Sequence, residues 1–187
     1  EKGKKQVEES AKILKGKGIT KIIASPFVRT TETAEMIANV LQYDKNQITF
    51  DDRLGEHFLG TLSGQSVDVY HQIAKNSEEV YEMRAGEGES LEDMKIRTGQ
   101  FIYEIDKANK DVTILIVTHQ HTAWALAAAA KGLNKQETIS LADYKNGFIK
   151  NAEIHEMDFV PLPHNFIFEI DLHKPFIDSL ELVDEKG

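Results

Sequence analysis

One histidine stands where a buried strand is expected to end. His119 follows the run Val112–Val117, in which all six residues are aliphatic or β-branched, and an alanine-rich helical stretch begins near Thr122. In an open α/β sheet, the carboxyl end of a strand and the N-terminus of the next helix form a crevice that favours anions. His119 is therefore a candidate for ligand binding or catalysis. The alternative is a polar side chain that only fills space there.

An arginine occupies the corresponding place after a second expected strand. The short apolar segment Ile19–Ala24 is followed by Ser25-Pro26, and proline is well suited to the first turn of a helix. Arg29 then lies one turn inside that helix, where its guanidinium could offer a planar set of donors to a phosphate or carboxylate. The alternative is an ordinary surface arginine.

A third candidate is the carboxyl group of Glu56. It belongs to the glycine-punctuated segment Arg53–Gly64, in which apolar residues flank it. Apolar neighbours remove water from a carboxyl group and raise its pKa, which suits a general acid. We therefore expect a raised pKa for Glu56.

The elements that must position these residues alternate along the chain. Apolar residues at helical spacing alternate with short apolar runs, which predicts an α/β fold with a mostly parallel sheet. The predicted helices cover residues 4–16, 27–41, 66–84, 90–109 and 122–131, and the predicted strands cover residues 19–24, 48–50, 112–117, 147–149 and 152–157.

Taken in order, the motifs resemble the histidine phosphatase superfamily, whose fold is phosphoglycerate mutase-like. The resemblance implies a three-layer α/β/α architecture with a mostly parallel sheet. It rests on Gly3 and Gln6, the Ser-Pro-x-x-Arg-x-x-x-Thr-Ala run at 25–34, the Leu-x-Glu-x-x-x-Gly-x-x-x-Gly run at 54–64, Gly88-Glu89-Ser90 with Arg97, Val117-Thr118-His119, and a closing strand near 151–154.

The resemblance implies a role for each candidate. In this family a histidine of an Arg-His-Gly motif attacks phosphorus, and a second histidine and arginines bind the phosphoryl oxygens. By resemblance His119 is that second histidine, both catalytic and phosphate-binding, Arg29 is a phosphate ligand, and Glu56 is the acid that protonates the leaving oxygen. The expected ligand is a small phosphomonoester or phosphate, with no metal and no cofactor.

The sequence departs from the family pattern at the nucleophile. No Arg-His-Gly tripeptide occurs in the 187 residues, so we expect the first strand of the sheet to be missing and the chain to be inactive alone. Gln120 stands where the family usually has glycine. His57 and His121 are expected near the site. The His119-x-His121 pair also suggests a metal, but no cysteine or carboxylate cluster accompanies it, and we expect none.

The chain changes character after residue 157. Pro161-Leu162-Pro163 reads as a linker, and Asn165–Asp178 resembles the segment by which class I isoleucyl-tRNA synthetases re-enter their catalytic domain. We therefore expect a histidine phosphatase-like domain at 1–157 and a linker with a synthetase-like segment at 158–187. Such a segment should be poorly anchored on the first domain. The alternative is the amphipathic tail of a phosphatase.

Three hypotheses follow from these resemblances. The chain is part of a catalytic histidine phosphatase module, a non-catalytic phosphate-binding insertion in an isoleucyl-tRNA synthetase, or part of a free-standing phosphatase. In the synthetase case the parent protein would also bind tRNA and ATP. The chain itself contains neither the His-Ile-Gly-His nor the Lys-Met-Ser-Lys-Ser motif of aminoacylation.

Composition sets outer limits on function. A net charge of −9 argues against a nucleic-acid surface, and the absence of cysteine excludes disulfides and thiol chemistry. No apolar run approaches the ~20 residues of a membrane span, and no signal peptide is recognisable. We therefore expect a cytoplasmic chain with no membrane partner.

Overall fold

A parallel β-sheet lies at the centre of the computed structural model, which describes residues 2–65, 76–142, 148–171 and 173. Its strands are β1 (Ile19–Ala24), β2 (Thr49–Phe50) and β3 (Thr113–Val117), in the order β2-β1-β3. The α-helices of the described residues are α1 (Lys2–Leu14), α2 (Val28–Leu41), α4 (Ser77–Glu82), α5 (Leu91–Ala108), α6 (Gln120–Ala130) and α7 (Lys135–Ser140), and the short 3₁₀ helices are η1 (Lys45–Gln47), η2 (Asp52–Leu54) and η3 (Gly60–Leu62).

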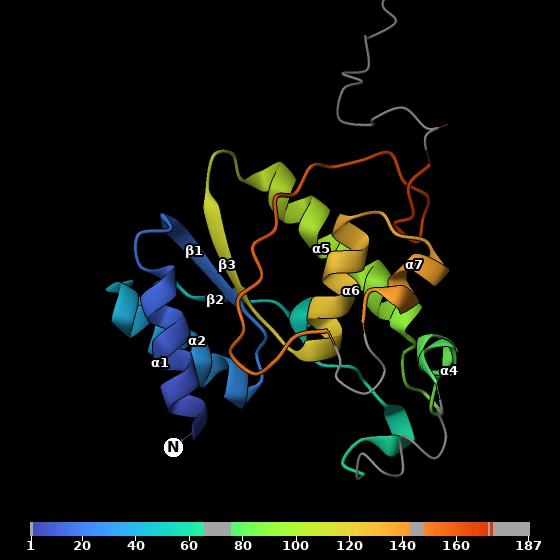
Figure 1. The fold of residues 1–187 in the computed structure, drawn as a ribbon, viewed down its shortest axis with the longest axis horizontal. Helices are drawn as coiled ribbons and strands as arrows, with labels where there is room; N and C mark the ends of the chain where they lie inside the picture. The colour runs from blue at the N-terminus through green and yellow to red at the C-terminus, as the bar shows by residue number, and fades with distance from the viewer. Residues whose placement is uncertain (1, 66–75, 143–147, 172, 174–187) are drawn as a thin grey trace, which may run out of the picture.

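Helices cover both faces of the sheet. Because side chains alternate along a strand, Ile22 and Ala24 pack with α1 and α2, whereas Ile23 faces Phe101 of α5 and Leu126 of α6. Figure 1 shows α1 and α2 on one side of the strands and α5 and α6 on the other. The predicted three-layer α/β/α fold with a parallel sheet is confirmed.

The two longest strands pair directly with each other. In β1 and β3, Ile22 lies opposite Leu115, and Ala24 lies opposite Val117. Both strands therefore end at the same level, and β3 forms an edge of the described sheet. The expectation that the sheet lacks a strand finds no support in the described residues.

Two predicted strands are wrong in the part of the chain that the structure describes. Residues 148–149 and 152–157 form no strand; Gly147 lies outside the described residues. Ala152 adopts a positive φ of 58°, which interrupts an extended backbone. Ala152 and Ile154 instead pack as single side chains against the core between the sheet, α1 and α2. The apolar pattern of this segment reflects that packing, because a strand also needs a neighbouring backbone to pair with.

The predicted helix at 66–84 is found only in part. Helix α4 begins after Asn76, whose side chain accepts hydrogen bonds from the backbone N–H groups of Glu78 and Glu79 at 3.0 Å each. Residues 66–75 lie outside the described residues. None of the helices in the described ranges is both long enough and apolar enough to cross a bilayer.

The segment after residue 157 is anchored on the domain, contrary to expectation. Phe168 is only 7% exposed, and its ring stacks on His164 at 4.7 Å and meets Tyr103 of α5 at 5.2 Å. Gly99 of α5 leaves room for that ring, since a Cβ there would come within 2.4 Å of it. The backbone N–H of Ile170 also donates to the carbonyl of Gly132 at 2.9 Å. The expected poor anchoring is wrong up to residue 171, while a domain boundary at 157 stays a prediction.

This packing predicts that Phe168→Ala lowers the free energy of unfolding by about 3 kcal/mol, the usual cost of emptying a buried phenylalanine site. Phe166, two residues earlier and 82% exposed, provides the matched control, because Phe166→Ala should leave stability nearly unchanged. Urea unfolding of both variants measures the difference. Equal stabilities would mean that the segment does not pack on α5 in solution.

Candidate functional site

The carboxyl ends of β1 and β3 bring the first two candidate residues together. The backbone N–H of Ser25 donates to the carbonyl of Val117 at 2.9 Å, so the chain leaves both strands at one point. Arg29, in the first turn of α2, donates from Nε to Nδ1 of His119 at 3.1 Å, and His119 is the residue that precedes α6. The two side chains predicted from separate motifs therefore share one crevice.

The hydrogen bonds fix the protonation state of His119. Arginine can only donate, so Nδ1 of His119 accepts, and Nε2 carries the proton and donates to Oγ of Ser25 at 2.8 Å. Burial lowers the pKa of His119 to about 4, opposed by the carboxylate of Glu56 and aided by the charges of Arg29 and Arg97. The imidazole is therefore neutral at pH 7, and its contact with Glu56 is no ion pair under those conditions.

Glu56 lies on the rim of the same crevice. Its Oε2 is 3.9 Å from both Arg29 Nη2 and His119 Nδ1. Its Oε1 is 3.5 Å from Nδ1 of His121 and accepts the backbone N–H of His57 at 3.0 Å.

The expectation of a raised pKa for Glu56 is wrong. Burial by itself would raise the pKa of this carboxyl group, but the contact and charge of His121, the N–H of His57 and the charge of His119 together lower it to about 2. Glu56 is thus a carboxylate in this structure. The sequence placed apolar residues beside Glu56, but it could not show that a ring from α6 approaches it.

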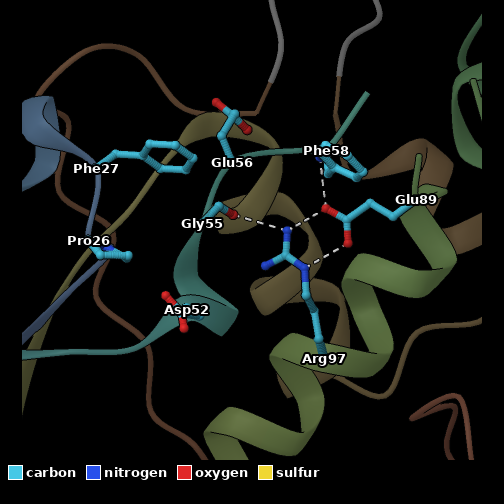
Figure 2. Close-up of a pocket in the computed structure, with 8 residues that line it drawn as sticks. All are labelled: Pro26, Phe27, Asp52, Gly55, Glu56, Phe58, Glu89 and Arg97. Atoms are coloured by element: carbon cyan, nitrogen blue, oxygen red, sulfur yellow. Dashed lines mark hydrogen bonds and ion pairs between the residues drawn. The ribbon is translucent and has the colours of Figure 1, made fainter. Parts of the chain in front are cut away.

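A partly buried ion pair holds the segment that carries Glu56. Arg97 of α5 donates from Nε and Nη2 to the two carboxylate oxygens of Glu89, each at 2.8 Å, from Nη2 to the carbonyl of Gly55 at 3.0 Å, and from Nη1 to the carbonyl of Arg53. Glu89 in turn accepts the backbone N–H of Phe58 at 2.9 Å. Figure 2 shows Arg97 between Gly55 and Glu89.

Further bonds tie this segment to the end of β3 and the start of α6. Thr118 donates to the carbonyl of Leu54 at 2.7 Å, and Thr122 donates to that of Gly55 at 2.6 Å. Glu89 stands among the acidic residues near the start of α5, where a side chain often faces solvent, but in this structure it faces Arg97. The only sequence signal for this pair was the presence of both residues in the family-like motifs.

A cavity of about 260 Å³ opens beside Glu56. Its apolar wall consists of Pro26, Phe27 and Phe58, and Asp52 and Glu56 also line it. Figure 2 shows the side chains of Phe27, Asp52 and Glu56 around this space. The cavity adjoins the crevice because Phe27 also packs edge-on against His119, with 5.2 Å between the ring centroids.

The other histidines of the described ranges lie away from this crevice or add to its wall. His57 is buried behind Glu56, where Nε2 donates to the carbonyl of Glu89 at 2.7 Å, and its ring meets that of His121 at 5.5 Å. His155 contacts Glu153, and His71 lies outside the described residues. No group of three or more metal-binding side chains is found among the residues that the structure describes.

Sequence similarity identifies the class to which this fold and crevice belong. Residues 1–165 match the model of the histidine phosphatase superfamily (branch 1), so the chain belongs to that family. Among curated relatives, the probable phosphoglycerate mutase GpmB of Escherichia coli O1:K1 / APEC is 30% identical over 137 residues, which are 71% of this chain and 62% of that protein. GpmB of Enterobacter sp. (strain 638) is 27% identical over 169 residues, 87% of this chain and 74% of that protein.

Solved structures agree on the fold. Bacillus stearothermophilus YhfR superposes with a TM-score of 0.65 at 26% identity, covering 79% of this chain and 74% of that one. A mycobacterial glucosyl-3-phosphoglycerate phosphatase superposes with a TM-score of 0.67 at 22% identity over the same shares, which speaks for the fold alone. The chain spans 62% of the length of the first curated relatives. These similarities give the synthetase resemblance no support.

The low pKa of His119 predicts a dependence of stability on pH. Unfolded histidine has a pKa near 6.5, whereas the pKa of His119 in the fold is about 4. Between these values the unfolded state binds a proton that the folded state does not, so stability is complete above about pH 6.5 and declines as the pH falls toward 4. His57, whose pKa burial also lowers, adds to the slope.

NMR of the ring nitrogens distinguishes the titration of His119 from that of His57. The His119 ring should stay in its neutral Nε2–H form throughout this interval, and His119→Gln should flatten the decline seen in urea unfolding. A ring that takes up its proton near pH 6.5 would contradict the buried geometry.

Proposed function

We propose that this chain binds the phosphoryl group of a small phosphomonoester at Arg29 and His119, as part of a histidine phosphatase-type site for hydrolysis or phosphoryl transfer. The observation that carries the proposal is the 3.1 Å contact between Arg29 Nε and His119 Nδ1 at the ends of two paired parallel strands. Two donors at one strand edge are what a phosphoryl group requires as its charge spreads over its oxygens.

The donors available to a ligand come from three sources. The side chain of Arg29 is 62% exposed, so its terminal N–H groups can reach a ligand in the crevice. His119 can turn its Nε2–H from Ser25 to a phosphoryl oxygen. The N-terminus of α6, which begins directly after His119, adds the positive end of a helix dipole.

Glu56 is the proposed acid for the leaving oxygen. With its pKa at about 2 it starts as a carboxylate, and an incoming phosphate dianion would be repelled by it. That repulsion favours the protonated carboxyl in the complex, because a nearby like charge raises the pKa. Phosphate binding therefore moves Glu56 toward the protonated form that an acid for the leaving group requires.

Neither His119 nor His57 is placed to act as the nucleophile of this chemistry. His119 uses both ring nitrogens, and His57 commits Nε2 to Glu89. The sequence contains no Arg-His-Gly motif. This favours phosphate binding as the property of the 187 residues by themselves. A synthetase setting for the site has no observation in its favour, and a free-standing histidine phosphatase is the simpler parent.

Phosphate titrations test the binding site. Arg29→Gln should weaken inorganic phosphate binding roughly tenfold or more, because a charge-assisted hydrogen bond contributes about 1.5–3 kcal/mol. Arg84→Gln is the matched control, since Arg84 is exposed and pairs with Asp93. Glu56→Gln should tighten binding at pH 7 about tenfold by removing a like charge. Unchanged affinity in Arg29→Gln, measured by calorimetry, would refute the assignment.

A second experiment examines turnover. The chain should release no phosphate from phenyl phosphate above the blank and form no acid-labile phosphohistidine, because binding groups without a nucleophile supply only part of the rate. Turnover that disappears in His121→Ala would contradict this and assign the nucleophile to His121, which faces Glu56 at 3.5 Å.

A further inference from the structure

We propose that the cavity beside Glu56 is the leaving-group subsite, and that it selects phosphomonoesters whose leaving group is an aromatic ring without negative charge. This rests on the proposed phosphate site at Arg29 and His119. The proposal goes beyond the phosphate site because it infers the chemistry of the leaving group. That inference comes from the residues that line the cavity, which do not bind the phosphate itself.

The position of the cavity relative to the phosphate ligands is the first argument. Phe27 contacts both ligands: its ring centroid is 5.2 Å from that of His119 and also 5.2 Å from the Arg29 guanidinium carbon. The same residue also lines the cavity, together with Glu56. An ester whose phosphoryl group lies on Arg29 would therefore extend past the acid that protonates its leaving oxygen and into this space.

The apolar wall is the second argument. Phe27 and Phe58 are 46% and 55% exposed, an unusual exposure for two phenylalanines that face one cavity. A ring placed against them would cover apolar surface now in contact with water and would gain ring-to-ring contacts. A volume of about 260 Å³ lies just below the usual range for small-molecule sites, which suits one ring and not an extended chain.

The charge of the lining is the third argument. The charged side chains that line the cavity, among the described residues, are Asp52, Glu56, Glu89 and Arg97. Arg97 is bound on both sides of its guanidinium by Glu89 and by two backbone carbonyls, so it neutralises Glu89 and offers little to a ligand.

Asp52 and Glu56 therefore give the lining of the cavity a net negative charge. A carboxylate or second phosphate on the leaving group would lie within a few ångströms of both, where like charges repel strongly. Relatives of this chain are named probable phosphoglycerate mutases. The phosphoglycerate of that name bears such a carboxylate. The lining of this cavity favours a different class of ester, one with a neutral or cationic ring.

Three phosphonates that cannot be hydrolysed test the proposal on the full chain. Methylphosphonate reports the phosphate ligands alone, phenylphosphonate adds a ring, and phosphonoacetate adds a carboxylate. By calorimetry at one pH and ionic strength, phenylphosphonate should bind about tenfold tighter than methylphosphonate, and phosphonoacetate should bind more weakly than both.

Two variants locate the preference in this cavity. Phe58→Ala should reduce the phenyl-to-methyl affinity ratio to near one, while Phe166→Ala on the far segment should leave the ratio unchanged. Asp52→Asn should raise the affinity for phosphonoacetate several-fold, because it removes one of the two repelling charges.

The outcomes separate the two proposals. Failure of all three ligands to bind would overturn the phosphate site itself. Binding of methylphosphonate with no gain from the ring, or with phosphonoacetate as the tightest ligand, would keep the phosphate site and overturn the aromatic subsite. A phenyl preference that persists in Phe58→Ala would also overturn it, because the ring would then bind elsewhere.

Discussion

The parallel pairing of β1 with β3 is the constraint on which the site depends. With Ala24 opposite Val117, the chain leaves both strands at the same height, and Arg29 in the first turn of α2 reaches His119 just before α6. Arg29 and His119 meet only because this register holds. A shift of a single residue would turn alternate side chains to the opposite face, which would separate these two residues and unpack Ile22 and Ile23 from their helices.

The second constraint is electrostatic: most polar groups of the crevice already have hydrogen-bond partners within the protein. Arg97 is occupied by Glu89 and two carbonyls, and His119 is neutral and hydrogen-bonded at both nitrogens. Arg29 and Glu56 are consequently the groups whose electrostatic interactions an incoming anion changes. In the described crevice, Arg29 therefore attracts a phosphoryl group, and the pKa of Glu56 rises when that group binds.

The sequence predicted the elements whose residues carry a strong local pattern. β1 lies at the predicted residues, and α2, α5 and β3 differ from prediction by only a few residues at their ends, because apolar spacing, the proline at 26 and the Ser90 cap act locally. The sequence could not predict the long-range contacts. Four features depend on which distant residue lies alongside, and local pattern does not encode this. They are the effect of His121 on Glu56, the pairing of Glu89 with Arg97, the absence of a strand at the described residues 152–157, and the packing of Phe168.

The anchoring of residues 53–58 has a further consequence. Four separate elements hold this short stretch: Arg97 from α5, Thr118 after β3, Thr122 from α6 and Glu89 before α5. Its conformational entropy is therefore lost during folding and not when a ligand arrives. A ligand that meets Glu56 finds a rigid partner, so its affinity is not diminished by ordering a loop. By the same connection, a substitution of Arg97 on α5 would loosen the segment that carries Glu56 without removing either proposed phosphate ligand.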